Sequence, residues 1–358
     1  MVHVILFSII GLGFLTRKSG KWGQALPFVA LFIFSALRYN FGNDYVSYYN
    51  KFNLIKIGGE VFKDPLFEWL NRVSPSFQFM IFITSLAYIA VIYWLIKKEM
   101  PKEYICLSIF IFIISPYLFL MNLSSLRQCI AMLFFIVAVH FSSKKNYLLY
   151  FFFVLVAMQF HQSAVILFPF VFFANERKFD KKYVFAYLAV LAVLLTMDNF
   201  TSIIQNIASG FDDKNYLYYA NNGIKNSLRA TLLSGISALY VVLNLPELKG
   251  KTLMYSKLYL FSPTLAVLAV RMSSITRIQM YFDIFAIIAL PLIFKHNLEK
   301  GKVEIDRTQI GKTILEILKR YVLPALILII YLLRYYSFFT NVLWEEFFVY
   351  RTIFSAGM

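Results

Sequence analysis

The sequence predicts an all-α protein that crosses a membrane many times. Apolar residues make up 60 % of the 358 residues and charged residues 15 %, whereas soluble domains carry about a quarter of charged residues. Apolar runs recur from the first residue to nearly the last, and no segment between them has the length of a soluble domain. We therefore expect a single membrane domain over residues 1–358, with about twelve transmembrane helices.

Twelve apolar windows supply these helices, although several are shorter than the roughly 20 residues of an upright span. They are 2–16, 22–37, 77–96, 104–122, 126–141, 147–160, 163–174, 183–197, 228–245, 254–271, 277–294 and 321–336. The first is predicted to be a retained helix rather than a signal peptide, because its basic residues follow the apolar run. The sixth and seventh meet at His161 in MQFHQSAVILFPF, where two short helices and one broken helix are the alternatives.

The basic residues of the loops predict the orientation. If every window spans, most of the 35 lysines and arginines fall in short loops on one side, among them the loop 295–320. The positive-inside rule makes that side cytoplasmic. Both termini and the long loops 38–76 and 198–227 then face outward, and we expect short amphipathic helices in these loops, at the membrane surface.

Six ionisable residues map to the outer half of the membrane and none to the inner half. Such residues are costly in lipid and usually line a cavity or a pathway. Arginine binds phosphate oxygens in a bidentate manner and stays charged when partly desolvated. The set therefore suits a lipid with an anionic head, such as a diphosphate carrier: Arg38, Arg127, His161, Arg271, Arg277 and Asp283.

Most of these residues also have a structural interpretation. Arg38 or Arg271 alone can be an anchor at the membrane interface. Arg277 and Tyr281 share a helix face and can contact each other. Asp283 can pair with Arg277 and orient it.

His161 is open to two interpretations, because it suits a hydrogen-bonded helix break as well as a catalytic or substrate-binding group.

The aromatic residues of the outer loops also have two interpretations. They suit an aromatic belt at the membrane interface or a groove in which sugar rings stack on aromatic faces: Tyr45, Tyr48, Tyr49, Tyr216, Tyr218, Tyr219 and Trp344.

Several function classes are not indicated. The net charge of +16 does not predict nucleic-acid binding, because the basic residues lie in short loops rather than on one soluble face. Cys106 and Cys129 are spaced for neither a zinc site nor a redox pair. The GKT at 311–313 lacks the glycine of a phosphate-binding loop, since Asp306 stands there. We expect no metal site and no cofactor.

Three stretches resemble the EpsG family of Wzy-type polysaccharide polymerases. They are LRYNFGNDYVSYYNKF, SSLRQCIAMLFFIVAVHF followed by FHQSAVILFPF, and ITRIQMYFDIFAIIALPLIF. They occur in the family's order between residues 30 and 295. The residues that match these motifs are Arg38, Gly42, Asp44, Arg127, Gln128, His161, Arg277 and Tyr281.

The resemblance implies a GT-C-like architecture in the bacterial inner membrane, with both termini and the active site periplasmic. It implies that a growing glycan leaves undecaprenyl diphosphate and joins the non-reducing end of a new lipid-linked repeat unit. Products of such enzymes are O-antigen of lipopolysaccharide, capsule or exopolysaccharide. The implied partners are undecaprenyl-diphosphate-linked oligosaccharides, membrane lipids and a chain-length regulator.

Within that chemistry, arginines stabilise the charge on the departing diphosphate without a metal, and a base activates the acceptor hydroxyl. The expected diphosphate-binding residues are Arg38, Arg127, Arg271 and Arg277, with His161 or Asp44 as base. Asp283 is expected to orient an arginine. The expected glycan-binding residues are Tyr45, Gln128, Gln162, Tyr216 and Tyr281.

Two other functions fit part of the pattern. An O-antigen ligase-like transferase needs the same diphosphate chemistry and a similar topology. A flippase for lipid-linked oligosaccharide is expected to carry ionisable residues through the full depth of the membrane, and the apolar inner half argues against it.

Overall fold

A computed structural model describes residues 2–178, 228–270, 274–300 and 309–355. These residues are mostly helical, with one pair of two-residue strands, which confirms the all-α prediction. The chain forms two compact units. The first contains Met1–Phe172 and Tyr331–Met358, and the second contains Phe173–Ile330.

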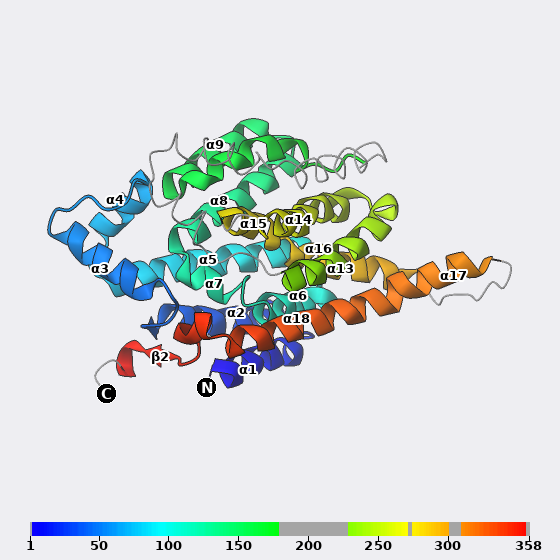
Figure 1. The fold of residues 1–358 in the computed structure, drawn as a ribbon, viewed down its shortest axis with the longest axis horizontal. Coiled ribbons are helices and arrows are strands. Elements are labelled where there is room, and N and C mark those ends of the chain that lie inside the picture. The colour runs from blue at the N-terminus through cyan, green and yellow to red at the C-terminus, as the bar shows by residue number, and fades with distance from the viewer. Residues whose placement is uncertain (1, 179–227, 271–273, 301–308, 356–358) are drawn as a thin grey trace. The chain divides into compact units, whose positions relative to one another are not determined.

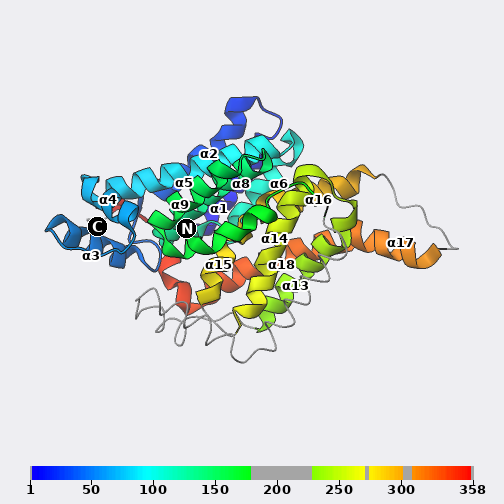
Figure 2. The same ribbon diagram turned by 90° about the horizontal axis from the view of Figure 1, so that it is seen from above.

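The long helices of the first unit pack in a row. Helix α2 (Lys21–Ala36) packs against α5 (Phe77–Glu99), α5 against α8 (Leu126–Ser143), and α8 against α9 (Tyr147–Phe160). Helix α1 (Val2–Leu15) packs against α2 and against α6 (Ile105–Ile114). Figures 1 and 2 show α5, α8 and α9 side by side.

The loop 38–76, which we call the outer loop, folds into two short helices, as predicted. These are α3 (Tyr45–Lys56) and α4 (Pro65–Val73), shown in blue in Figure 1. Proline at the first position of α4 costs no hydrogen bond, because that N–H has no partner within a helix. Their apolar side chains share one core with the ends of α5 and α8: Tyr45, Tyr48, Phe52, Ile55, Phe62, Phe67, Phe77, Met80, Ile81, Leu126 and Ile130.

The C-terminal segment covers the start of the outer loop. After α18 (Leu323–Thr340) come the turn η6 (Val342–Phe347), strand β2 (Arg351–Thr352) and the turn η7 (Ile353–Ser355). Strand β2 pairs antiparallel with β1 (Arg38–Tyr39). Gly42 has a φ of +99° and its N–H donates a 3.1 Å hydrogen bond to the carbonyl of Glu346. The tail and the outer loop therefore lie at the same end of the unit, as the predicted orientation requires.

The predicted break at His161 is present. Helix α9 ends at Phe160, His161 is extended with φ −159° and ψ 114°, and a 3-10 helix, η2 (Gln162–Phe172), follows. Two smaller elements complete the first unit, η1 (Lys102–Tyr104) and α7 (Leu120–Ser124). The window 104–122 is therefore not one helix, because α6 ends at Ile114, just before Pro116, and α7 begins at Leu120.

The second unit is also helical. Helix α14 (Gly250–Leu268) packs against α13 (Leu228–Asn244), α15 (Ser274–Asp283) and α16 (Ala286–Glu299). The turn η3 (Leu245–Glu247) joins α13 to α14. The chain bends by 47° between α15 and α16, so the window 277–294 is a bent pair of helices.

The last long helix begins earlier than predicted. Helix α17 (Ile310–Ile317), the π-helical turn η5 (Leu318–Val322) and α18 form one continuous apolar helix over Ile310–Thr340. The basic residues after Ile310 thus lie in a helix, and the cytoplasmic location of residues 295–320 stays a prediction. Since 31 residues exceed the roughly 20 of an upright span, the charged first turns can extend beyond the apolar layer.

Among the described residues, three helices are long and apolar enough to cross a membrane, namely Phe77–Glu99, Leu126–Ser143 and Ile310–Thr340. A fourth is added if α15 and α16 form one span. The chain is thus an all-α membrane protein. The window 183–197 and the loop 198–227 lie outside the described residues. The count of twelve spans, the single membrane domain and the periplasmic termini stay predictions.

Candidate active site

Arg127 lies in the first turn of α8, beside the outer loop. Its Nη1 donates a 2.6 Å hydrogen bond to Oδ2 of Asp64. Only 3 % of the Asp64 side chain is exposed, whereas 27 % of the Arg127 side chain is. Asp64 therefore holds the guanidinium from the protein side, while part of the guanidinium stays accessible.

Asp64 also contacts the break after α9. It stands at the N-cap of α4, where an aspartate usually accepts a hydrogen bond from the first turn, but its side chain makes no such bond. Instead, Oδ1 accepts a 3.1 Å hydrogen bond from the backbone N–H of Gln162. One carboxylate thus joins Arg127 to the residue that follows His161.

His161 is buried at that break, with 6 % of its surface exposed. Its backbone N–H donates to the carbonyl of Ala157 at 2.9 Å and closes α9, and its own carbonyl accepts from Ala164 at 3.0 Å. The histidine therefore shapes the chain path that brings Gln162 to Asp64. A catalytic role for its ring stays a prediction.

Two residues of α3, Tyr48 and Lys51, lie near Arg127. Burial raises the pKa of Tyr48, while the charge of Arg127 and a hydrogen bond to it act in the opposite direction. The Nζ of Lys51 lies 5.5 Å from the centroid of the Phe62 ring, and Cζ of Arg127 lies 5.1 Å from the same centroid. We call Tyr48, Lys51, Phe62, Asp64 and Arg127 the Arg127 cluster.

Asp44 precedes α3 and is exposed. Its backbone N–H donates a 2.8 Å hydrogen bond to Oγ of Ser124, three residues before Arg127. Burial and the charge of Arg127 lower the pKa of Lys51, and the charge of Asp44 opposes this shift, so the carboxylate lies near the Arg127 cluster. The structure thus brings Asp44, Arg127 and Gln162 together around one part of the first unit.

Arg38 lies in a different environment. It is 1 % exposed, and its guanidinium donates to the carbonyl of Ser35, to Oγ of Ser85 at 2.9 Å and to the carbonyl of Leu123 at 3.0 Å. These contacts join the end of α2 to α5 and α7. In this conformation Arg38 ties helices together and is enclosed, which is why we leave it out of the diphosphate site proposed below.

The remaining predicted residues belong to the second unit or lie outside the described residues. Arg277 is half-buried on α15 and Tyr281 is fully buried. The carboxylate of Asp283 accepts hydrogen bonds from Ser262 and, at 3.3 Å, from Gln279. Arg271 and Tyr216 lie outside the described residues. The convergence of all six ionisable residues on one level stays a prediction.

A comparison with protein families relates the sequence to known proteins. The profile of the EpsG family matches residues 24–352, which is nearly the whole chain. The chain belongs to the EpsG family. EpsG proteins are Wzy-like polymerases, so membership implies a polymerase-like function in exopolysaccharide or O-antigen synthesis. No curated protein and no solved structure matches the chain.

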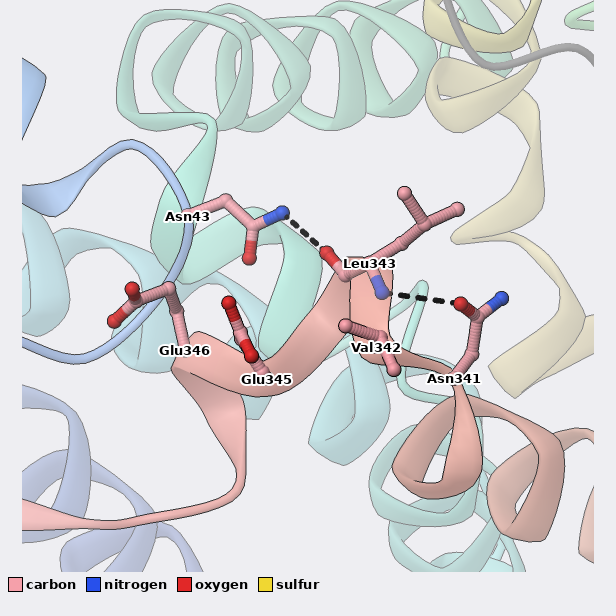
Figure 3. A pocket seen from close by; sticks show the side chains of 6 residues that line it. All are labelled: Asn43, Asn341, Val342, Leu343, Glu345 and Glu346. Carbon is pink, nitrogen blue, oxygen red and sulfur yellow. Dashed lines mark hydrogen bonds between the residues drawn. The ribbon is translucent and has the colours of Figure 1, made fainter.

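The EpsG match extends to residue 352, well past the part in which motifs were recognised from the sequence. The added part includes the segment that covers the outer loop. An open depression of about 440 Å³ lies there, lined by Asn43, Asn341, Val342, Leu343, Glu345 and Glu346. Figure 3 shows that Asn43 donates to the carbonyl of Leu343, whose N–H in turn donates to Asn341.

The depression differs in chemistry from the Arg127 cluster of this EpsG protein. Amides and carboxylates line it, without a basic side chain, so it suits hydroxyl groups better than phosphate. Asn43 is the residue before Asp44, which places the depression next to the predicted base. Of the residues predicted to bind glycan, Tyr45, Gln128 and Tyr281 are buried and Gln162 is half-buried.

Sequence reasoning missed Asp64, Lys51 and the C-terminal segment. The signal at Asp64 was the dipeptide Asp64-Pro65, which is typical of a helix start and does not by itself indicate an ion pair. Lys51 lies in the stretch LRYNFGNDYVSYYNKF, 13 residues after Arg38, and nothing in that stretch indicates a contact with Arg127. Among the described residues, no group of three histidine, cysteine, aspartate or glutamate side chains is placed to hold a metal ion.

Proposed function

We propose that this EpsG-family chain joins lipid-linked oligosaccharide repeat units at the periplasmic face of the bacterial inner membrane. The growing glycan leaves undecaprenyl diphosphate and moves to the non-reducing end of the next lipid-linked unit. The product is an O-antigen, a capsule or an exopolysaccharide. The architecture proposed for the chain is that of a GT-C glycosyltransferase.

One observation carries the location of the site in this proposal. Arg127 is fixed by the buried carboxylate of Asp64 beside the break at His161, and part of its guanidinium remains accessible. An arginine held in this way needs no reorganisation when charge develops near it, and such preorganisation is a main source of transition-state stabilisation. The exposed Asp44 is on the adjacent loop, where an acceptor sugar has access.

The proposed reaction proceeds as follows. An acceptor hydroxyl oxygen attacks the anomeric carbon of the growing glycan, the bond from that carbon to the phosphate oxygen breaks, and undecaprenyl diphosphate leaves. Arg127 stabilises the negative charge on the leaving diphosphate. Asp44 or His161 takes the hydroxyl proton. The proposal includes no metal, because an arginine can stabilise the charge of the leaving diphosphate.

The depression beside Asn43 is the proposed position of the sugar residues. Its volume falls within the range of small-molecule sites, and its amides and carboxylates can exchange hydrogen bonds with hydroxyl groups. The sugars then lie next to Asp44, because Asn43 is the preceding residue.

A ligase that attaches finished glycan is the second candidate, because it needs the same leaving group. The two differ in the phenotype of cells without the chain. Loss of a polymerase leaves single repeat units on the surface, whereas loss of a ligase leaves polymer on the lipid carrier. Loss of a flippase removes even the single repeat.

The experiment is a gel of the surface polysaccharide from cells lacking this chain, complemented with wild type, Arg127→Ala, Asp44→Ala or His161→Ala. Arg72→Ala is the matched control, because Arg72 forms an exposed ion pair with Glu68 on α4 at 3.1 Å. We expect the deletion to leave a single repeat, Arg72→Ala to restore the ladder and Arg127→Ala to fail. An Arg127→Ala protein that is present in the membrane and restores a normal ladder overturns the assignment of the site.

A further inference from the structure

Lys51 forms no ion pair with a carboxylate among the described residues, although the charge of Asp44 acts on it. It lies one turn after Tyr48 on α3 and is half-buried. Its Nζ contacts the face of Phe62 at 5.5 Å from the centroid. Among the described residues, no hydrogen bond or ion pair of its ammonium group is found, although each ammonium can donate three hydrogen bonds.

Arg127 shares the same aromatic ring. Its Cζ lies 5.1 Å from the Phe62 centroid, so one phenyl group interacts with two cations. A cation over an aromatic ring gains only about 0.5–2 kcal/mol, which does not offset the desolvation of two neighbouring positive charges. Such a pair is stable when an anion neutralises it.

The two carboxylates near the Phe62 ring do not enclose both cations. Asp64 forms an ion pair with Arg127 from the buried side, which accounts for one positive charge. Burial and the charge of Arg127 lower the pKa of Lys51, while Asp44 raises it. Asp44 is exposed and belongs to the loop before α3, so it favours the protonated form of Lys51 without enclosing it.

We propose that Lys51 and Arg127, positioned by the ring of Phe62, form one site for the diphosphate of a lipid-linked donor. This inference rests on the proposed function and adds Lys51 as its second phosphate-binding cation. The two side chains suit different parts of the group. Arginine presents a planar fork to two oxygens, while lysine acts as a mobile point charge that can follow the second phosphate as the sugar leaves.

The chain contains a matched control on the same helix. Lys56 lies five residues after Lys51, and its Nζ is 5.1 Å from the centroid of the Phe52 ring. It donates a 2.7 Å hydrogen bond to the carbonyl of Arg72. Lys56 thus has the same charge, helix and type of aromatic contact as Lys51, but lies away from Arg127 and has a protein partner.

The test measures binding to the purified full-length protein in detergent, with farnesyl diphosphate as a short prenyl diphosphate probe. Lys51→Met is the main variant, because it keeps the length of the stem that packs on Phe62. We expect it to weaken binding of farnesyl diphosphate by about tenfold or more, the effect of one charge-assisted hydrogen bond. Lys51→Arg should retain binding, and Lys56→Met should bind like wild type.

Two additional measurements distinguish a prenyl diphosphate from other phosphate ligands. Binding of farnesyl monophosphate should not depend on Lys51, because a single phosphate contacts Arg127 alone. Vesicles of phosphatidylglycerol should not compete, since their single phosphodiester lacks the second phosphate. Competition by these vesicles at equal phosphate concentration shows a site for anionic lipid in general and overturns the proposal.

The outcomes separate this inference from the proposed function. If Lys51→Met and Lys56→Met bind the probe equally while Arg127→Ala does not bind, Lys51 is no part of the site and the proposed function stands. If Arg127→Ala also binds like wild type, the location of the proposed active site fails with it. Thermal unfolding of Lys51→Met should match that of Lys56→Met, and a large loss of stability confined to Lys51→Met assigns it a structural role instead.

Discussion

Replacing Asp64 with asparagine removes the negative charge that holds Arg127 and keeps the size of the side chain. Asparagine can accept one hydrogen bond through its oxygen, but its NH₂ group then faces a donor, either Nη1 of Arg127 or the N–H of Gln162. Breaking a buried ion pair by removing one partner costs about 3–5 kcal/mol. Because 27 % of the Arg127 side chain is exposed to solvent, we expect a smaller loss, about 2 kcal/mol.

The assay combines stability and activity in a double-mutant cycle. Asp64→Asn and Arg127→Gln are made singly and together, and the free energy of unfolding of each purified protein is measured. The double variant should recover about 1 kcal/mol or more relative to the sum of the single losses, because neither charge is then left unpaired. All three variants should lack the polysaccharide ladder, since the guanidinium is either absent or no longer held in place.

Two results would refute this reasoning. Additive losses of stability mean that the two side chains do not interact in the folded protein. A normal ladder from Asp64→Asn, at wild-type levels in the membrane, means that the orientation of Arg127 by Asp64 does not matter for function.

Three more predictions follow from other contacts. Gly42→Ala should lower the melting temperature, because the residue has a φ of +99° and its new Cβ would lie 3.2 Å from the Phe347 ring. The expected cost in the free energy of unfolding is about 1–3 kcal/mol. Gly11→Ala is the control in the same unfolding scan and should not be destabilised, because a Cβ at this helical position has no atom within 4 Å. Arg38→Met should reduce the yield of folded protein in gel filtration, because two backbone carbonyls and a hydroxyl lose their buried donor; normal folding combined with lost diphosphate binding would instead support a role in the site. Although burial opposes the shift, hydrogen bonds from two lysines lower the pKa of Glu247 from 4.5 to about 2. The stabilising effect of the ionised carboxylate is therefore present above pH 4.5 and is lost as the pH falls toward 2. The pH dependence of the free energy of unfolding between pH 4.5 and 2 should shrink in Glu247→Gln, and an unchanged profile would contradict the ion pairs.

Much of the fold could be predicted because apolar windows report directly on helices. The break at His161 was visible because the polar residues His161, Gln162 and Ser163 stand where two apolar windows meet. The early start of the last helix was not visible. Lys312, Lys319 and Arg320 resemble a basic loop, yet Glu316 lies one turn from the last two and pairs with them at 3.1 and 2.9 Å, which stabilises a helix.

Some residues of the candidate site were recognisable from the sequence, for a different physical reason. Arg127 and Asp44 are recognisable because charge next to an apolar run is unusual in a membrane protein. Arg38 has the same local pattern, but packing encloses it between α2, α5 and α7. Only the fold distinguishes the two arginines, because burial depends on helices that are remote in the sequence. Asp64 was missed for this reason too, since its partner lies 63 positions along the chain.

The pairing of β1 with β2 has a consequence for the biogenesis of the protein. Residues 38 and 39 are synthesised well before their partners at 351 and 352. During translation the backbone groups of the early strand, and Gly42 next to it, have no partner from the late segment. The loop that carries Asp44 therefore reaches its final form only after residues 351 and 352 have been synthesised, and a nascent chain that stalls before that point is expected to have an incomplete outer loop.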